Sequence, residues 1–216
     1  MLSTWQAPGG SEELAIQCAG DSGSRLLVLP AWFDESNKTR HFTVELMRLL
    51  AERGIASFLP DLPGCNESTV DLSIQTLRSW REAATAAATQ FACTQVLAIR
   101  AGANIAPELP GFAYAPLAGK TALRALVRAR TLAAKEAGRP ETAEALLQTG
   151  KVEGLELVGY HLGPAMVADL SEATLAPSAL VPVEPGGPLL WLRAEPEHNP
   201  EQAAALADLI AAGLAA

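Results

Sequence analysis

The chain has 216 residues, 49% of them hydrophobic and 19% charged, which suits the core of one large domain and is not the composition of a disordered protein. Its formal net charge of −8 argues against nucleic acid and against an anionic membrane surface as partners, because both need clustered Lys and Arg on the protein.

The cysteines and the N-terminus indicate a reducing compartment. Cys18, Cys65 and Cys93 match no zinc or redox spacing, so we expect three reduced thiols, no metal and no cofactor. Residues 1–17 lack the basic and apolar regions of a signal peptide, and no apolar stretch approaches the roughly 20 residues of a membrane helix. We therefore expect a cytoplasmic protein without a membrane span.

The first half of the chain alternates short apolar runs with helical patterns. Strands are expected over residues 12–18, 26–29, 55–59 and 95–99, and helices over 43–53 and 72–90, with a further helix that can begin within 103–109. Residues 31–40 are expected to form a polar loop. This alternation, with short links, predicts a mostly parallel, doubly wound α/β sheet with helices on both faces.

The pattern changes after residue 115. Helices are expected over 120–137, 141–148 and 200–214, helical turns over 164–170, strands over 154–160 and 188–193, and a loop over the Pro- and Gly-rich residues 177–188. No linker divides the chain, so we expect a single domain over residues 1–216. Within it, residues 120–185 are expected to form an insertion or cap over one end of the sheet, followed by a short C-terminal part.

The strand at 95–99 leads into a turn with the spacing of a nucleophile elbow. That elbow is a strand–turn–helix crossing with the motif G-x-S-x-G, whose serine attacks the substrate. Here the five residues are Ala98 to Gly102, and Arg100 stands in the place of the serine. A guanidinium stays protonated and has no lone pair with which to attack a carbonyl. Ordinary serine-hydrolase chemistry is therefore excluded at this position, and we assign no catalytic residue.

Two roles for Arg100 remain open. At the start of a helix, its charge and the unpaired backbone N–H groups would suit a carboxylate, sulfate or phosphate. Alternatively, Arg100 pairs internally with Asp34 or Glu35 and holds the loop that carries them.

The loop over residues 31–40 is the second candidate component of a ligand site. Its hydrogen-bond donors are Asn37, Lys38 and Arg40, which could equally cap a turn or meet solvent. Trp32 could form an apolar wall. In enzymes with a nucleophile elbow, backbone N–H groups of this loop and of the residue after the nucleophile hold the oxyanion, and here these would be Trp32 and Ala101. Such a pocket without a nucleophile would bind an anion or an acyl carbonyl without cleaving it.

Several segments resemble one family. Residues 30–40, 61–68, 99–103 and 159–162 are similar to segments of the exosortase A system-associated hydrolases of the second type, and the resemblance runs from about Leu26 to Arg193. Its most specific parts are the Asn-Lys-Thr-Arg run at 37–40 and the arginine elbow.

This resemblance implies the α/β-hydrolase fold, a bacterial cytoplasmic setting and a link to exopolysaccharide synthesis and the exosortase system. The chain departs from the family pattern with Ala98 for the first elbow glycine and Asn66 for another glycine. Taken together, the sequence predicts a degenerate α/β-hydrolase-fold protein that binds an anionic or acyl ligand without serine-hydrolase activity.

Two other classes of function stay open. One is a hydrolase or acyltransferase that uses a bound water or another nucleophile, with Cys65, Ser68 and Asp61 as candidates. Cys65 is the best of these chemically, because a thiolate near Lys38 and Arg40 would have a lowered pKa. The other is a scaffolding subunit that docks a protein partner through its alanine-rich helices.

The three histidines have no assigned role. His41 could face the pocket or cap a helix, and His198 could approach the site or lie on the surface of a charged loop. His161 is expected to be a packed or hydrogen-bonded side chain.

Overall fold

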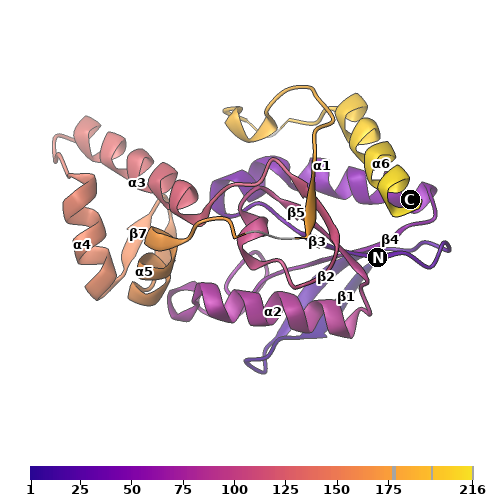
Figure 1. Cartoon of the computed structure of the whole chain (residues 1–216). Helices are drawn as coiled ribbons and strands as arrows, with labels where there is room; N and C mark the ends of the chain where they lie inside the picture. The colour runs from indigo at the N-terminus through magenta and orange to yellow at the C-terminus, as the bar shows by residue number, and fades with distance from the viewer. Residues whose placement is uncertain (177–178, 196, 216) are drawn as a thin grey trace.

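The main sheet of the protein has the predicted doubly wound form. The computed structural model describes residues 1–176, 179–195 and 197–215, and its strands run in the order β1-β2-β4-β3-β5-β6-β9 (Figure 1). These strands are β1 (Leu2–Gln6), β2 (Glu12–Cys18), β3 (Arg25–Leu29), β4 (Ala56–Pro60), β5 (Gln95–Ile99), β6 (Gly111–Tyr114) and β9 (Leu180–Val183). The strands predicted at 12–18, 26–29, 55–59 and 95–99 are confirmed.

The order of the strands fixes where a site can form. From β3 the chain runs to β4 on one side, and from β4 it returns past β3 to β5 on the other, so the order reverses between β3 and β5. Strands β3, β4, β5, β6 and β9 are parallel, whereas β1 and β2 are antiparallel additions at one edge. Ligands of doubly wound sheets bind at the carboxyl ends of the strands beside such a reversal.

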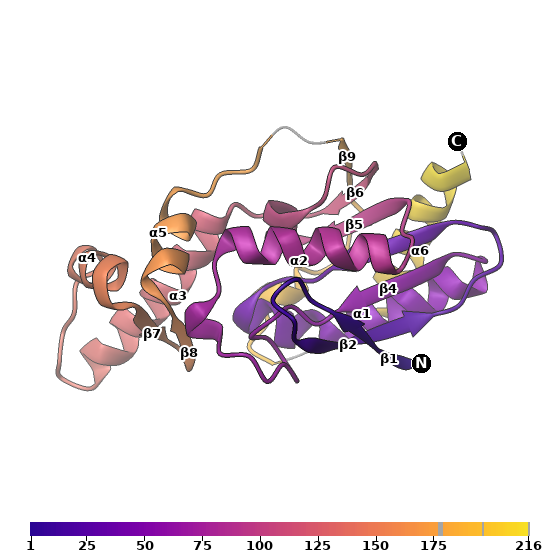
Figure 2. The ribbon, with the colours of Figure 1, turned by 90° about the horizontal axis from the view of Figure 1, so that it is seen from below.

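Helices cover both faces of the sheet (Figures 1 and 2). Helix α2 (Leu77–Gln90) lies on one face, and helices α1 (Phe33–Glu52) and α6 (Pro200–Ala215) lie together on the other. Trp80 of α2 is fully buried in one core, and Phe42 of α1 packs in the second core with Ile210 of α6. Helix α2 begins at a capping box between Thr76 and Ser79, which satisfies backbone donors at its N-terminus.

The predicted polar loop over residues 31–40 is wrong, because most of it is the first part of α1. Trp32 is extended and the helix begins at Phe33, with Asp34 and Glu35 in its first turn, where carboxylates favour the helix dipole. The ion pair between Lys38 and Asp34 then supports the helix at a spacing of four residues. The polar side chains that suggested a loop are paired with each other or with neighbouring segments.

The segment after β5 also differs from the prediction. No α-helix follows the elbow; a 3₁₀ turn, η2, spans Arg100–Ile105 and the chain returns directly into β6. Pro107 accounts for this, because a proline disfavours helical backbone at the preceding residue, and Ala106 is extended. A second 3₁₀ turn, η1 (Leu72–Ile74), precedes α2, so the helix predicted at 72–90 begins later than expected.

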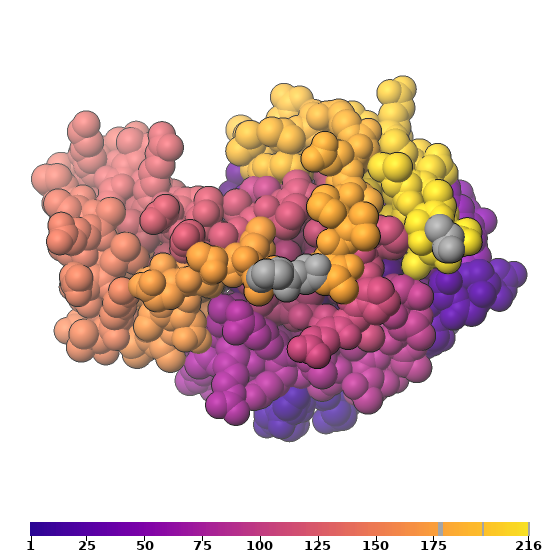
Figure 3. Space-filling view, viewed as in Figure 1, coloured from indigo at the N-terminus to yellow at the C-terminus, as the bar shows by residue number. Residues whose placement is uncertain are grey.

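Beyond the carboxyl ends of the strands lies a small cap made of helices and a hairpin (Figure 1). Its elements are α3 (Gly119–Glu136), α4 (Ala143–Glu153), β7 (Leu155–Leu157), β8 (Tyr160–Leu162) and α5 (Pro164–Glu172). The predicted helices are confirmed here, but the strand expected at 154–160 is a two-stranded hairpin that turns at Val158 and Gly159. In the space-filling view the cap stands apart from the segment near residue 190 (Figure 3).

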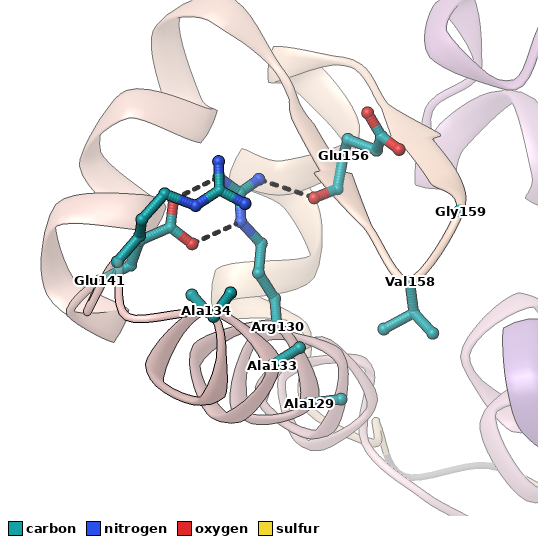
Figure 4. A pocket seen from close by; sticks show the side chains of 10 residues that line it. Ala129, Arg130, Ala133, Ala134, Glu141, Glu156, Val158 and Gly159 are labelled. Atoms are coloured by element: carbon teal, nitrogen blue, oxygen red, sulfur yellow. Dashed lines mark hydrogen bonds and ion pairs between the residues drawn. The ribbon is translucent and has the colours of Figure 1, made fainter.

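Arg130 holds the cap together from inside. Its guanidinium donates two hydrogen bonds to the carboxylate of Glu141, at 2.9 and 2.7 Å, and a third to the carbonyl of Glu156 at 2.7 Å (Figure 4). It thereby joins α3 to the segment before α4 and to β7. A hollow of about 680 Å³ between α3 and the hairpin tip borders this cluster. Arg139 also lines the hollow, but Arg130 is committed to Glu141 and Glu156.

Two predictions near the C-terminus are wrong. The strand expected at 188–193 is a 3₁₀ turn, η3 (Leu190–Leu192), and the last strand of the sheet, β9, lies in the segment predicted as a loop, of which residues 177 and 178 lie outside the described residues. Strand β9 tolerates Pro182 because it is an edge strand that pairs only with β6. In the parts of the chain that the structure describes, no helix is both long and apolar enough to cross a membrane.

Candidate functional site

The backbone at Arg100 has the geometry of a nucleophile elbow. Its φ of 53° is in the left-handed region, which a residue other than glycine rarely adopts. At Gly102 a side chain would place its Cβ 2.6 Å from the carbonyl oxygen of Leu29 and 2.7 Å from that of Pro30. The turn thus crosses directly over the end of β3, as the spacing of residues 98–102 predicts.

The guanidinium of Arg100 is bound internally. It donates to both carboxylate oxygens of Glu35 at 2.9 Å and to the carbonyl of Ala115 at 2.9 Å. Its Cζ lies 4.2 Å from the ring centroid of Trp191, which adds a cation–π contact. Only 11% of the side chain is exposed. Of the two roles left open by the sequence, the structure displays the internal pairing, with Glu35 as the partner.

The other predicted donors do not gather around Arg100. Lys38 pairs with Asp34 at 2.7 Å along α1. Arg40 contacts Asp61 at 3.5 Å, on the side of α1 that faces β4. Asn37 donates a hydrogen bond of 3.2 Å to the hydroxyl of Tyr160 in the cap. Arg40 and Asn37 thus connect α1 to two different neighbouring segments, whereas Lys38 is paired within the helix.

A cleft does lie over the elbow, and we call it the elbow cleft. It has a volume of about 300 Å³ and is lined by the beginning of α1, the elbow, helix α3, the hairpin tip and η3. Trp32 and Ala101, the two residues predicted to supply oxyanion donors, both line it, as does Lys38. Ala101 is the second residue of η2 and Trp32 precedes α1, so neither backbone N–H has a partner within its own helix.

The cap side of the elbow cleft is apolar. Its lining from α3 consists of Ala122, Ala125, Leu126 and Ala129, and Val158 of the hairpin tip completes this wall. The alanines leave the space that larger side chains would fill. The cleft therefore has a hydrocarbon wall on the side of the cap, and Trp32 and Ala101 belong to its lining on the side of the sheet.

Backbone strain is concentrated around the elbow cleft. Phe33 has φ 56° and Val158 has φ 52°, and both line the cleft. Arg100 and Ala115, at φ 53° and 46°, are joined by a hydrogen bond directly behind it. Each such residue costs on the order of 1–3 kcal/mol, and conformations of this kind cluster at binding and active sites.

A second pocket, of about 250 Å³, lies between α1, the 62–66 loop and Tyr160, and we call it the Cys65 pocket. Trp32 lines both this pocket and the elbow cleft. The side chain of Trp32 is 4% exposed, and within the described residues its buried indole N–H has no hydrogen-bond partner. A buried donor without a protein partner is costly, and a water molecule or a ligand with an acceptor atom would satisfy it.

The prediction of a lowered pKa for Cys65 is wrong. Burial, and then the carboxylates of Asp61 and Glu13, raise the pKa of this thiol to about 12. Lys38 and Arg40 do not offset this, because each is paired with a carboxylate. Cys65 is therefore a protonated thiol at neutral pH and not an activated nucleophile.

The remaining nucleophile candidates are also committed to structural contacts. Ser68 donates to the carboxylate of Glu13 at 3.0 Å and accepts from the backbone N–H of Gly64 at 2.9 Å. Asp61 accepts from Asn66 and Arg40, and burial is the main cause of its raised pKa. Neither residue lines the elbow cleft.

None of the three imidazoles is positioned as a catalytic base. His41 and His198 stack on each other with ring centroids 4.6 Å apart, on the outer side of α1. His161, expected to be packed, is 69% exposed and lies 3.5 Å from the carboxylate of Glu156. Within the described residues, no hydrogen bond joins a histidine to a serine or cysteine, and no group of three His, Cys, Asp or Glu side chains could hold a metal ion.

Sequence reasoning missed two members of the site, Trp191 and Tyr160. Trp191 was placed in a strand that does not form, and no sequence pattern links it to Arg100 across the chain. Tyr160 lies in the 159–162 segment that carries the family resemblance, and its contacts with Asn37 and Phe33 depend on how the cap folds back.

Comparison with known proteins shows the fold. No family model and no curated protein matches the chain in sequence. The solved structure of mouse alpha/beta hydrolase domain-containing protein 10 is similar with a TM-score of 0.52 and 14% identity, over 79% of this chain and 69% of the mouse chain. At this identity the likeness concerns architecture alone, and it confirms the predicted α/β-hydrolase fold.

Two further structures are similar over smaller parts. A candidate hydrolase from Agrobacterium vitis has a TM-score of 0.48 and 18% identity, over 62% of this chain and 60% of its own. The epoxide hydrolase VrEH1 from Vigna radiata has a TM-score of 0.40 and 17% identity, over 49% of this chain. The chain spans only 60% and 33% of the lengths of these two proteins.

Proposed function

We propose that this protein is a non-catalytic member of the α/β-hydrolase fold that binds a small acyl ligand in the elbow cleft. The observation that carries the proposal is the pairing of Arg100 with Glu35 at the position of the nucleophile. This pairing puts a neutralised, largely buried side chain where an attacking oxygen or sulfur would stand. The cleft above it nevertheless keeps the apolar wall and the backbone donors of a binding site.

The charges of the cleft favour the acyl alternative over the anionic one. Arg100 and Lys38 each have a carboxylate partner, so neither offers a free positive charge to an anion. The carboxylates of Asp34 and Glu35 themselves line the cleft and would repel one. An uncharged acyl group needs only an apolar wall for its chain and an N–H donor for its carbonyl, and Ala101 and Trp32 supply such donors.

The volume of the cleft limits the ligand. A cavity of about 300 Å³ equals the volume of about ten water molecules, which suits an acyl chain of roughly six to eight carbon atoms. The backbone strain at Phe33 and Val158 supports a binding role, because these conformations persist only where the surrounding structure imposes them.

A setting in the exosortase system rests on the sequence resemblance of residues 30–40, 61–68 and 99–103. In that setting the protein would bind an acylated compound of exopolysaccharide synthesis in the cytoplasm without hydrolysing it. The unpaired N–H of Trp32, within the segment that carries the resemblance, supports a ligand site there.

The experiment that tests the proposal is a titration with methyl octanoate, an uncharged acyl ester, followed by the fluorescence of Trp32 and the other tryptophans. We expect saturable binding, tighter than that of octanoate, whose carboxylate meets Glu35 and Asp34. Replacement of Ala129 in the cleft wall, Ala129→Phe, should weaken binding at least tenfold because the ring occupies the cleft.

The matched control is Ala133→Phe, one helical turn further along α3, where the side chain borders the 680 Å³ hollow of the cap but does not line the elbow cleft. This variant should bind methyl octanoate as the unmodified protein does. Absence of saturable binding, or equal binding by the two variants, would refute the acyl site.

A further inference from the structure

A third pocket lies beside the elbow cleft and belongs to a different part of the fold. It has a volume of about 270 Å³ at the carboxyl ends of β6 and β9, and residues 182–187 and Leu189 cover it. We call it the β6–β9 pocket. Trp191 lines both this pocket and the elbow cleft, so its ring forms the partition between them.

Gln202 of α6 presents a hydrogen-bond acceptor without a donor at this pocket. Its side-chain N–H groups bind the carbonyls of Gly186 and Pro188, the latter at 3.1 Å. Two carbonyl partners fix the orientation of the amide, because its oxygen could not take the place of the nitrogen there. The amide oxygen is then left buried and, within the described residues, unpaired, on a side chain that is 4% exposed.

Tyr114, at the end of β6, provides a second polar group of the same kind. Its hydroxyl is buried and unpaired among the described residues, and the residue is 5% exposed. Burial raises the pKa of Tyr114 to about 12, so the phenol is uncharged at neutral pH and can both donate and accept a hydrogen bond. Its ring packs edge-on against Trp191, at 5.7 Å between centroids, which fixes it at the pocket wall.

We propose that the β6–β9 pocket binds a small uncharged molecule that combines an apolar part with a hydroxyl or amide N–H group. The amide oxygen of Gln202 requires a donor, and the hydroxyl of Tyr114 complements either a donor or an acceptor beside it. The apolar part would contact Trp191, Pro182 and Pro185. Both polar atoms are closed to solvent, and residues 182–187 and Leu189 cover the pocket that they border.

The charges around the pocket exclude the ionic alternatives. An anion would meet the amide oxygen of Gln202 and the carboxylate of Glu184, with no cation in the lining. A cation would need a buried counter-charge, but Glu184 is exposed to solvent.

The probes for this site are propionamide and 1-propanol, with propionate as the charged counterpart. Each is titrated into the full chain while the ring resonances of Trp191 are followed by NMR. We expect saturable shifts with the amide and the alcohol and none with propionate. Tyr114→Phe should weaken propionamide binding about five- to tenfold, the effect of one uncharged hydrogen bond.

The chain's other tyrosine provides the matched control. Tyr160→Phe removes a hydroxyl that accepts a hydrogen bond from Asn37 in a different pocket, and it should leave propionamide binding unchanged. Tyr114→Phe should also retain or raise the midpoint of urea unfolding, since the lost hydroxyl has no partner.

Three results would overturn the proposal: no saturable shift with either neutral probe, binding of propionate equal to that of propionamide, or unchanged binding by Tyr114→Phe. A structure in which only an ordered water bonds Gln202 and Tyr114, with the probes present, would do the same. Because Trp191 also lines the elbow cleft, variants assign the shift to one pocket: Tyr114→Phe should weaken propionamide binding, whereas Ala129→Phe in the elbow cleft should leave it unchanged.

Discussion

The guanidinium of Arg100 and the carboxylate of Glu35 lie in parallel and share two hydrogen bonds of 2.9 Å. This fork-to-fork arrangement is the strongest geometry that an arginine and a carboxylate can adopt. It connects the turn after β5 to the first turn of α1, and these are the two segments that hold nucleophile and oxyanion in enzymes of this fold. In this chain an ion pair connects these two segments.

The pairing predicts strong coupling between these two residues. Arg100→Ala or Glu35→Ala alone leaves one charge largely buried without its partner and should lower the free energy of unfolding by about 3 kcal/mol. The double variant should lose less than the sum of the two by at least about 1.5 kcal/mol. Urea unfolding of the four proteins measures this coupling.

The control pair is Arg78 and Glu82 on the exposed side of α2, whose side chains are 85% and 51% accessible. The same double-mutant cycle there should give a coupling below about 0.5 kcal/mol. If the two cycles gave equal coupling energies, the Arg100–Glu35 pair would stabilise the protein no more than a surface ion pair does.

A side chain at position 102 is predicted to destabilise the protein, because the turn leaves no space for a Cβ. Gly102→Ala would place a Cβ 2.6 Å from the carbonyl oxygen of Leu29, where neither backbone segment can easily move. We expect a loss of about 1–3 kcal/mol in the free energy of unfolding. Gly9→Ala is the control, because nothing lies within 4 Å of the added Cβ. If the two variants unfolded at the same urea concentration, the contact between position 102 and the carbonyl oxygen of Leu29 would not restrict the side chain there.

Alkaline conditions should destabilise the protein. Burial raises the pKa of Cys65 and of Cys93 to about 12, above the ordinary value of 9.0 that each has in the unfolded chain. The folded state therefore holds these protons more tightly, so the stability they contribute is complete below about pH 9 and is lost as the pH rises towards about 12. Urea unfolding at a series of pH values measures how steeply the free energy of unfolding falls between about pH 9 and pH 12.

The same thiols should react slowly with iodoacetamide at neutral pH in the folded protein. Rapid modification of Cys65 at pH 7, before unfolding, would contradict the raised pKa and would revive it as a nucleophile. Cys93→Ala should reduce the alkaline slope, which separates this effect from general unfolding at high pH.

The central sheet could be predicted because its signals are local. Buried strands such as 26–29 and 95–99 are continuous apolar runs, and Gly54 and the prolines mark their boundaries. The elbow could be located for the same reason: five consecutive residues define its spacing. The sequence also shows directly that an arginine stands in place of the serine.

What the sequence did not show depends on contacts between distant segments. The first turns of α1 look like a polar loop because their charges face Asp61, Arg100 and the cap, which no local pattern reveals. The prolines around strand β9 predict a loop. Pro182 fits a strand only because β9 lies at the edge of the sheet. The sequence left Asp34 and Glu35 open as partners of Arg100. The orientation of α1 about its axis decides between them, because it turns Glu35 towards Arg100.

Restoring a serine at the elbow should not create an enzyme. In Arg100→Ser the hydroxyl would have no imidazole to activate it, because His41 and His198 stack on each other and His161 faces Glu156. The variant would also leave Glu35 without its guanidinium. We expect hydrolysis of p-nitrophenyl acetate to remain at the rate of the unmodified protein. A burst of p-nitrophenol, the sign of an acyl-enzyme, would show that a base stands within reach.

The most direct test of the account is the intact mass of the unmodified protein after incubation with a fluorophosphonate probe, which forms a stable adduct with activated serines. Arg100 at the elbow predicts that the mass does not change, in the folded protein as in the urea-unfolded one. A single stoichiometric adduct on one serine, formed only in the folded state, would contradict the claim that this fold has exchanged its nucleophile for an ion pair.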